Sequence, residues 1–439
     1  MGVTFVQRFL PSASSFPPAY SSVVRKNDLR IARQPVFRNI FAARAVSLLG
    51  TSMAPVALAF AVLGEPGGSA ARLGLVLAGR SVAQVVFLMF GGALADRFPR
   101  YRIMVSSDLL AFAAQASVAA LFLTGHPPVA LLMALSAANG AANALFIPAS
   151  RGLIPQIVKR EELQSATALI QLSQNAASLA GAAISGAVIV AVGAGWAIGI
   201  DAATYAISAL LVLTSGAPRT GRGARDTSLL TELRDGWDEF RSRQWVWVIV
   251  AQFGLVNLCF TSCVYVLGPV VAKTHWDGAL GWSAVVTANA AGLIAGSFLA
   301  IRLRPRHPLL VATTATFGFL PPFFLLAAHA PVWAAAMAML VNGVSADVFE
   351  VLWQTALQQH VPHDKLSRVT SYDALGSFVL NPLGLLAIGP VAGVSGVTAT
   401  LIGAGILVTA GNVLALGSRS VRTLPASPEP AGPAAAGGT

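Results

Sequence analysis

Charged residues are scarce in this sequence. Only 11% of its 439 residues are Asp, Glu, Lys or Arg, whereas 55% are hydrophobic and the mean hydropathy is +0.69. A soluble protein carries about 25% charged residues, and its surface could not expose so much apolar sequence to water. Soluble enzymes, disordered regulators and secreted disulfide scaffolds are therefore excluded for the chain as a whole. The composition predicts a protein that crosses the membrane several times.

Cysteines and nucleotide-binding motifs are scarce too. Cys259 and Cys263 lie four residues apart inside an apolar run, so they form neither a disulfide framework nor a metal-ligand spacing. The six histidines fall in loops or at the ends of apolar runs. No P-loop or other glycine-rich phosphate cradle is present, so ATP cannot be the energy source within this chain. We expect no cofactor and no metal.

Long apolar runs, by contrast, are numerous. A membrane helix needs roughly 20 mostly apolar residues, and short charged or Pro- and Gly-rich breaks divide the sequence into twelve such runs. They cover residues 38–64, 72–97, 102–124, 128–150, 163–192, 195–215, 244–272, 279–303, 308–328, 331–358, 366–393 and 396–417. The fold class predicted is an all-α membrane protein of twelve transmembrane helices in two bundles of six.

The basic residues predict how these helices are oriented. With the N-terminus in the cytoplasm, 25 of the 29 Lys and Arg residues fall in cytoplasmic segments. Only Arg72 and Lys273 fall in outer loops, and Arg44 and Arg80 lie within spans. Lys and Arg concentrate on the cytoplasmic side of membrane proteins. We therefore expect a multi-pass protein of the inner or plasma membrane with both termini in the cytoplasm, and the net charge of +11 does not imply a nucleic-acid partner.

The spans and the polar segments define five parts. These are a basic cytoplasmic segment (1–36), a first six-helix bundle (37–215), a central cytoplasmic loop (216–243), a second bundle (244–417) and a disordered tail (418–439). The first segment has no apolar signal core, so we expect no cleaved signal peptide. In the central loop, Leu229, Leu233, Trp237 and Phe240 recur at helical spacing, which predicts an amphipathic helix on the cytoplasmic surface.

The two bundles repeat each other in sequence. At an offset of 203 residues, four glycines of the first half match four of the second. The pairs are Gly140 with Gly343, Gly181 with Gly384, Gly186 with Gly389, and Gly193 with Gly396. Two six-helix halves in the same order are the parallel-repeat design of a secondary transporter.

A charged motif follows the second span, where residues 91–104 read GGALADRFPRYRIM. Gly92 permits close helix approach, and Asp96 is a costly charge at a helix end that needs a partner. Arg151, which we place at the close of the fourth span, is the available cation. An ordinary positive-inside loop would explain the arginines but not the Gly–Asp spacing. The second-half copy, GSFLAIRLRPRH, has Ala300 in place of the acid.

This motif resembles the loop signature of the major facilitator superfamily, G-x-L-a-D-R-x-G-R-R. The matching residues are Gly92, Leu94, Asp96, Arg97, Arg100 and Arg102, with Pro99 where the signature has Gly. The resemblance implies the major facilitator fold and transport by alternating access. It also implies that Gly92, Asp96, Arg97, Arg100 and Arg151 form a conformational latch.

Other segments resemble the drug-exporter branch related to enterobactin and macrolide exporters. They are IPASRGLIPQIVKREELQSATAL (147–169), GWAIGIDAATYAISALL (195–211) and VLWQTALQQHVPHDKLSRVTSYDAL (351–375), and the similarity extends over roughly 36–417. One departure concerns the fifth span, where such exporters carry G-P-x-x-G-G. Here the residues are GAAISG, so Ala182 and Ser185 replace Pro and Gly, and a kink attributed to the proline is absent.

Amide side chains near the middle of the spans are candidates for binding substrate, because polar groups inside a membrane are expensive. At 1.5 Å per residue, four of them fall roughly 15–25 Å into their spans. They are Gln84, Asn143, Gln174 and Asn257. The alternative is that each forms a hydrogen bond between helices, worth about 0.6–2 kcal/mol.

Two carboxylates on the tenth span are candidates for proton coupling. Asp347 and Glu350 lie three residues apart and hence on one helix face. Acids close together in a low dielectric bind protons reversibly. The alternative is a structural ion pair with Arg44 or another basic residue. Of the remaining intramembrane acids, we expect Asp201 to be architectural and Asp373 to be a helix-end charge or a site.

The sequence therefore predicts a proton-driven exporter of small amphipathic compounds, such as drugs, antibiotics or siderophores. The alternative is an uptake or facilitative carrier of the same fold, because the loop signature serves both directions. An integral membrane enzyme would need clustered catalytic residues near one interface, and none occurs in the sequence. Besides its substrate, we expect protons and the lipid bilayer as partners, and a monomer.

Overall fold

The computed structural model describes residues 31, 34–125, 127–159, 162–216 and 237–426. Residues 89–97, 164, 363–364 and 367–368 are described by their backbone alone. Most of the segment 1–36, Leu229 and Leu233 of the predicted amphipathic helix, and most of the predicted tail lie outside the described residues.

The first half of the chain forms six helices, each apolar and long enough to cross a membrane. They are α1 (Pro35–Gly64), α2 (Ala70–Arg97), α3 (Arg100–Thr124), α4 (Val129–Ile157), α5 (Leu163–Val192) and α6 (Ala194–Leu213). Helix α4 runs past its predicted end, so Arg151 lies inside the helix rather than at its close. Its last turns persist despite Pro155 because Leu153 and Ile154 are buried in the core.

The second half forms six further spans, three of them broken. The seventh span is α8 (Gln244–Cys259), a π-helix η3 (Phe260–Leu267) and α9 (Gly268–His275), and the eighth is α10 (Ala279–Arg302). The ninth is α11 (Pro308–Ala315), a 3₁₀ turn η4 (Thr316–Phe319) and α12 (Leu320–Ala327), and the tenth is α13 (Val332–His360). The eleventh is α14 (His363–Phe378) and α15 (Asn381–Ser395), the twelfth is α16 (Val397–Gly417), and a short α17 (Arg419–Arg422) follows.

A proline opens the helix after each break. Pro269 lies in the first turn of α9, Pro321 in that of α12, and Pro382 in that of α15. Proline has no N–H to donate and clashes with the carbonyl four residues before it, so the regular helix ends there and restarts. Each of the three breaks thus has a proline where the helix restarts.

The repeated glycines occupy equivalent places in the two halves. A Cβ on Gly140 of α4 would meet the Arg80 carbonyl of α2, and one on Gly343 of α13 would meet the Asn289 carbonyl of α10. Gly193 and Gly396 each follow a helix, with φ of 91° and 81°. Because this backbone region favours glycine, the same chain reversal recurs in both halves. The sequence repeat is thus a structural repeat.

Two further glycine pairs hold helices together. Gly181 of α5 packs on Leu49 and Ser52 of α1, as Gly384 of α15 packs on Leu258 of α8. These contacts lie within the halves. One helical turn and a half further on, Gly186 and Gly389 face the opposite half instead.

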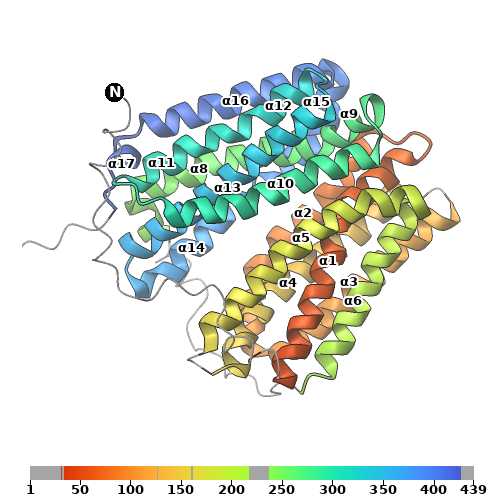
Figure 1. The fold of residues 1–439 in the computed structure, drawn as a ribbon, viewed down its shortest axis with the longest axis horizontal. Coiled ribbons are helices and arrows are strands. Elements are labelled where there is room, and N and C mark those ends of the chain that lie inside the picture. Colours follow the sequence, from red (N-terminus) through yellow and green to blue (C-terminus); the bar gives the residue numbers. More distant parts are fainter. Residues whose placement is uncertain (1–30, 32–33, 126, 160–161, 217–236, 427–439) are drawn as a thin grey trace, which may run out of the picture.

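The two halves meet at one end of the molecule and separate at the other. Helix α2 packs against α15, and α5 against α10. Gly389 meets Ala71, Gly186 meets Ser283, and the Lys273 ammonium donates to the Leu63 carbonyl. All these contacts lie toward the end that carries the 64–70 and 276–279 connections. Figure 1 shows the halves joined there, near α9, and diverging toward the end where α14 and α17 lie.

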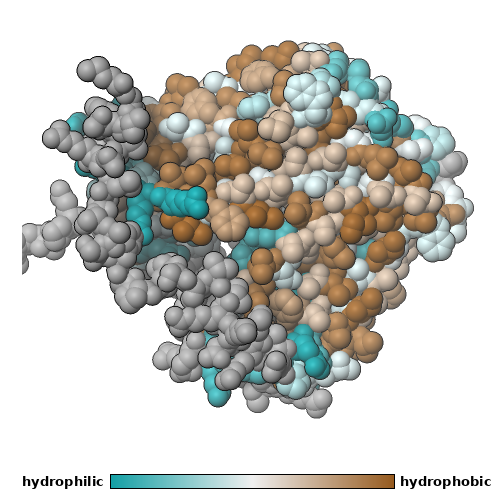
Figure 2. Space-filling view, in the orientation of Figure 1, coloured by the Kyte–Doolittle hydropathy of each residue, from teal (hydrophilic) through white to brown (hydrophobic). Residues whose placement is uncertain are grey.

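The outer surface has the apolar character of a membrane-facing protein. Val394, Leu414 and Trp333 are 93%, 76% and 73% exposed on the outside of the second half. Figure 2 shows apolar residues over most of the visible sides of the helices, with hydrophilic residues gathered toward the ends. In a bilayer these apolar side chains contact lipid. The helix backbone tolerates the same surroundings because its polar groups are hydrogen-bonded within the helix.

A short helical segment, residues 237–242, packs against the start of the eleventh span. The rings of Trp237 and Phe240 lie 5.6 and 5.8 Å from that of Tyr372. Glu239 binds Lys365 at 2.7 Å and Arg243 at 2.6 Å. The hydrogen bonds from Lys365 and then Arg243 hold the pKa of the Glu239 carboxyl below its usual range.

Replacing Glu239 by glutamine should loosen this segment. The stabilisation by a carboxyl with a depressed pKa is present above its unfolded value, about 4.3, and is lost as the pH falls through the folded value. Exposed ion pairs are weak, so we expect amide hydrogen exchange in 237–242 to rise roughly two- to fivefold at neutral pH. Asp238→Asn is the matched control, because Asp238 is exposed and adjacent. Equal amide exchange rates in the two variants would show that the Glu239 carboxylate does not hold this segment in place.

Candidate transport site

A line of buried polar side chains runs between α3 and α6 in the first half. Ser208 donates to Asp108 at 2.6 Å, and Gln115 donates to Asp201 at 2.6 Å. Asp108 is 1% exposed and Asp201 0%. On each helix the two members lie seven residues, or two turns, apart and so share one face. We call Asp108, Gln115, Asp201, Tyr205 and Ser208 the polar seam.

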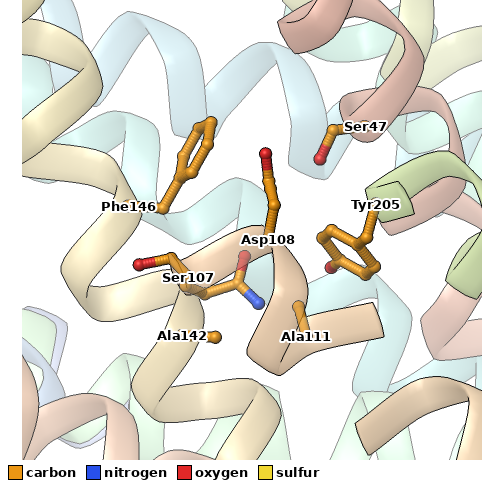
Figure 3. Close-up of a pocket in the computed structure, with 8 residues that line it drawn as sticks. Ser47, Ser107, Asp108, Ala111, Ala142, Phe146 and Tyr205 are labelled. Atoms are coloured by element: carbon orange, nitrogen blue, oxygen red, sulfur yellow. The ribbon is translucent and has the colours of Figure 1, made fainter. Parts of the chain in front are cut away.

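A small cavity adjoins the polar seam. Its volume is about 20 Å³, enough for about one water molecule. The polar residues that line it are Ser47, Ser107, Asp108, Asn143 and Tyr205. Figure 3 shows the Asp108 carboxylate standing between Phe146 and Ser47, with the Tyr205 ring beside it. Four helices thus converge on one polar point inside the apolar bundle.

Asn143, a predicted substrate contact, belongs to this polar point. Its amide donates to the Asn139 carbonyl at 3.0 Å and to the Asn139 side chain at 3.1 Å, and it also binds the Tyr205 hydroxyl. The Asn139 contacts lie within α4, and only the contact with Tyr205 of α6 is between helices, as the hydrogen-bonding alternative expects; the role of Asn143 toward substrate stays a prediction.

Asp347 and Glu350 have separate environments despite their spacing. Asp347 is half-buried, accepts a hydrogen bond from Ser297 of α10 at 2.7 Å, and packs over Gly296. Glu350 is exposed and accepts from Gln354 on its own helix at 2.9 Å. Arg44 donates to Ser150 of α4. The described side chains therefore contain no ion pair between Arg44 and either acid, and Asp347 carries the more protected carboxyl.

The other three predicted substrate contacts are scattered. Asn257 donates to the Ser377 carbonyl at 3.1 Å, in the last turn of α14 before the break in the eleventh span. It therefore satisfies a carbonyl at the broken helix. Gln84 is exposed on α2 and Gln174 half-buried on α5. No described hydrogen bond joins any of the four predicted residues to another, and their roles toward substrate stay predictions.

Only part of the predicted latch has described side chains. Gly92, Asp96 and Arg97 belong to the stretch described by backbone alone. Arg100 donates to the Gly152 carbonyl of α4, and Arg151 is exposed beside it. The start of α3 is thus held against the end of α4, next to the cation that we expect Asp96 to meet.

Two buried polar clusters were not predicted from the sequence. One is the polar seam, whose signal was the seven-residue spacing of Asp108 and Gln115, repeated by Asp201 and Ser208. The other lies in the second half, where Gln252 donates to Thr316 at 2.9 Å and to Asn412 at 2.8 Å. No regular spacing in the sequence predicts this second cluster, because its members come from three different spans. Asp373 likewise accepts from Trp353 at 3.0 Å.

Twelve apolar helices in two repeated bundles, joined at one end and apart at the other, define the class of the protein as a membrane transporter. Among the described residues, no group of three or more His, Cys, Asp or Glu could hold a metal ion. The chain belongs to the Major Facilitator Superfamily, whose sequence profile matches residues 40–385. The resemblance inferred from the loop signature is thereby confirmed.

Characterised relatives include exporters. The chain is 26% identical over 394 residues to the enterobactin exporter EntS of Salmonella choleraesuis (strain SC-B67), covering 86% of this chain and 93% of EntS. It is 25% identical over 425 residues to the multidrug efflux pump Tap of Mycobacterium bovis (strain BCG / Pasteur 1173P2), covering 90% and 96%. Family and relatives are transporters, not enzymes.

Solved structures confirm the fold. The nucleoside transporter NupG superposes with a TM-score of 0.72 at 11% identity, over 87% of this chain and 99% of NupG. A bacterial homologue of the human lysosomal transporter Spinster, in an inward-facing and unoccupied conformation, superposes with a TM-score of 0.65 at 13% identity, over 91% and 98%. The major facilitator fold of two parallel six-helix repeats is established.

Proposed function

We propose that this chain is a proton-coupled exporter of small amphipathic compounds that works by alternating access. The observation that carries the proposal is the one-ended contact between the halves, because an alternating-access carrier must close one end while the other is open. The export activity of the EntS and Tap relatives favours the outward direction. An uptake or facilitative carrier is the second candidate, since the same fold and loop signature serve it.

Orientation is part of the proposal. Arg72 and Lys273, the two basic residues predicted outside, both lie near the end where the halves meet: Arg72 donates to the Pro66 carbonyl and Lys273 to that of Leu63. With both termini in the cytoplasm, this conformation is closed outside and open inside. Cysteines placed at positions 230 and 435 should react only with reagents that enter the cytoplasm. Labelling of either from outside would contradict the orientation.

The loop latch is a further part of the proposal. Asp96 pairs with Arg151 when the cytoplasmic end closes, and Arg100 already connects the two helix ends through Gly152. Asp96→Asn should therefore impair transport about tenfold while insertion and expression stay largely intact, because one charge near a helix end changes the free energy of folding by only about 0.3–1 kcal/mol. Glu162→Gln, at the neighbouring connection, is the control. A normal transport rate in the Asp96 variant would reject the latch.

Accumulation of a panel of drugs and siderophores in efflux-deficient cells tests the proposed function. Cells that express the protein should retain less of at least one compound, and a protonophore should abolish the difference. Higher accumulation in expressing cells would favour the uptake carrier. Gln84, Asn143, Gln174 and Asn257 remain the proposed substrate contacts, and the proposed unit is a monomer in the plasma membrane.

A further inference from the structure

Asp201 is the most completely buried acid on the polar seam. It is 0% exposed, and Gln115 serves only its Oδ2 atom. Oδ1 has no hydrogen-bond partner among the described residues. That oxygen packs against Gly50 of α1, where an added Cβ would lie 2.6 Å from it. A buried ionised carboxylate with an unsatisfied oxygen is costly, whereas a protonated one is neutral.

A cation lies within reach of Asp201 but is not bonded to it. Arg80 of α2 interacts electrostatically with both Asp201 and Tyr205. Arg80 is half-exposed, and no ion pair joins it to Asp201 in this conformation. The helices packed around Asp201 thus present Gly50 and Thr51 of α1, Gln115 of α3 and Arg80 as the charged group. When Asp201 is ionised, Arg80 supplies a counter-charge nearby. When Asp201 is protonated, the neutral carboxyl is surrounded by the uncharged Gly50, Thr51 and Gln115.

Tyr205 connects Asp201 to the cavity. It lies one turn along α6, its hydroxyl is 3.0 Å from that of Thr51, and its ring lines the cavity that also contains Asp108. Asp201 and Tyr205 interact electrostatically, and no described hydrogen bond joins them in this conformation. The distance along the seam from Asp201 to Asp108 is two turns, about 10 Å.

We infer that Asp201 is a second proton-binding site, in the first half of the transporter, and that Tyr205 and the cavity beside Asp108 connect it to the cytoplasmic side. The inference rests on the proposed proton-coupled function and adds to it a site separate from Asp347. The polar seam lies on α3 and α6, and its cavity adds residues of α1 and α4, so all of these groups belong to the first half. Arg80 compensates the charge of Asp201 after the proton leaves.

Infrared difference spectroscopy of the full chain in lipid nanodiscs tests the site with protons as the only ligand. Between about pH 5 and pH 9, a protonated-carboxyl C=O band should disappear reversibly in the unmodified protein. Asp201→Asn, nearly isosteric, should lack that band, and Asp277→Asn, in an exposed loop, should retain it. A band unchanged in Asp201→Asn, or an Asp201 band that never titrates, would overturn the inference.

Tyr205→Phe tests the path. It preserves the ring and Asp201 itself, so the Asp201 band should remain while its exchange in D₂O slows about tenfold or more, as expected for loss of a positioned proton-transfer group. Unchanged exchange would overturn the path through Tyr205. These spectra need no transport substrate, so a negative result would contradict the Asp201 site without contradicting the proposed function. Export that a protonophore does not abolish would contradict the proposed function itself. Full proton-driven accumulation by Asp201→Asn would overturn its coupling role.

Discussion

Asp347→Asn should abolish uphill transport while downhill exchange of substrate continues. The amide mimics the protonated acid, so the carrier can still move through its closed intermediate, but it no longer binds or releases a proton. Asp347 is half-buried against Ser297 and Gly296. Its counterpart in the first half, Ala144, is fully buried and apolar, so the acid is not a requirement of the repeated scaffold.

Glu350→Gln is the matched control for this prediction. Glu350 lies one turn away on the same helix, but it is exposed and bonded only within α13. We expect accumulation by this variant to fall about twofold at most, because neutralising an exposed carboxylate removes only weak electrostatic interactions. The measurement is pH-gradient-driven accumulation and substrate exchange in proteoliposomes. Full accumulation in the Asp347→Asn, Glu350→Gln double variant would remove both acids from the mechanism.

Gly389→Val should prevent the halves from closing at the end where they now meet. Any Cβ at this position would lie 2.4 Å from the Ala71 Cα atom of α2, and backbone cannot yield cheaply. Overpacking costs about 1–3 kcal/mol, which corresponds to a decrease in the equilibrium constant for closure of roughly 5- to 150-fold. Because transport requires this closure, its rate should fall by a similar factor.

Gly393→Val provides the contrast, since it lies one turn along the same helix and nothing is within 4 Å of an added Cβ. Closure is measured as the distance between spin labels on Glu65→Cys and Asp277→Cys, with Cys259 and Cys263 replaced. The distance should lengthen in Gly389→Val and stay unchanged in Gly393→Val. Transport by Gly389→Val within twofold of the parent would show that this contact is not required.

Much of the fold was predictable from sequence because its causes are local. A span is recognised by twenty apolar residues in a row, since no other backbone structure satisfies its polar groups in lipid. All twelve predicted spans are present. The glycine pairs at one offset were also predictive: a small residue is needed wherever two helices approach closely, and both halves cross at the same points.

The sites were less predictable because a polar residue does not show its partner. The sequence presents Asp347 and Glu350 as equivalent neighbours, yet packing buries one against α10 and leaves the other exposed. It presents Asn257 as a midplane amide, and the fold directs it to a carbonyl of the broken eleventh span. Asp201, expected to be architectural, has a free oxygen and a nearby cation.

The sequence by itself determined the membrane class, the number of spans, the repeat and the family, because hydrophobic length and glycine spacing act within a few turns of one helix. Only the tertiary structure decided which end of the bundle is closed and which acids are buried. It also decided where prolines break a span: Pro55 and Pro148 lie inside unbroken helices, whereas Pro382 opens a new one. The reason is physical. Each of these outcomes depends on groups contributed by helices far apart in the chain, and the free energy of a buried charge or a freed carbonyl is set by whichever partner those helices bring to it.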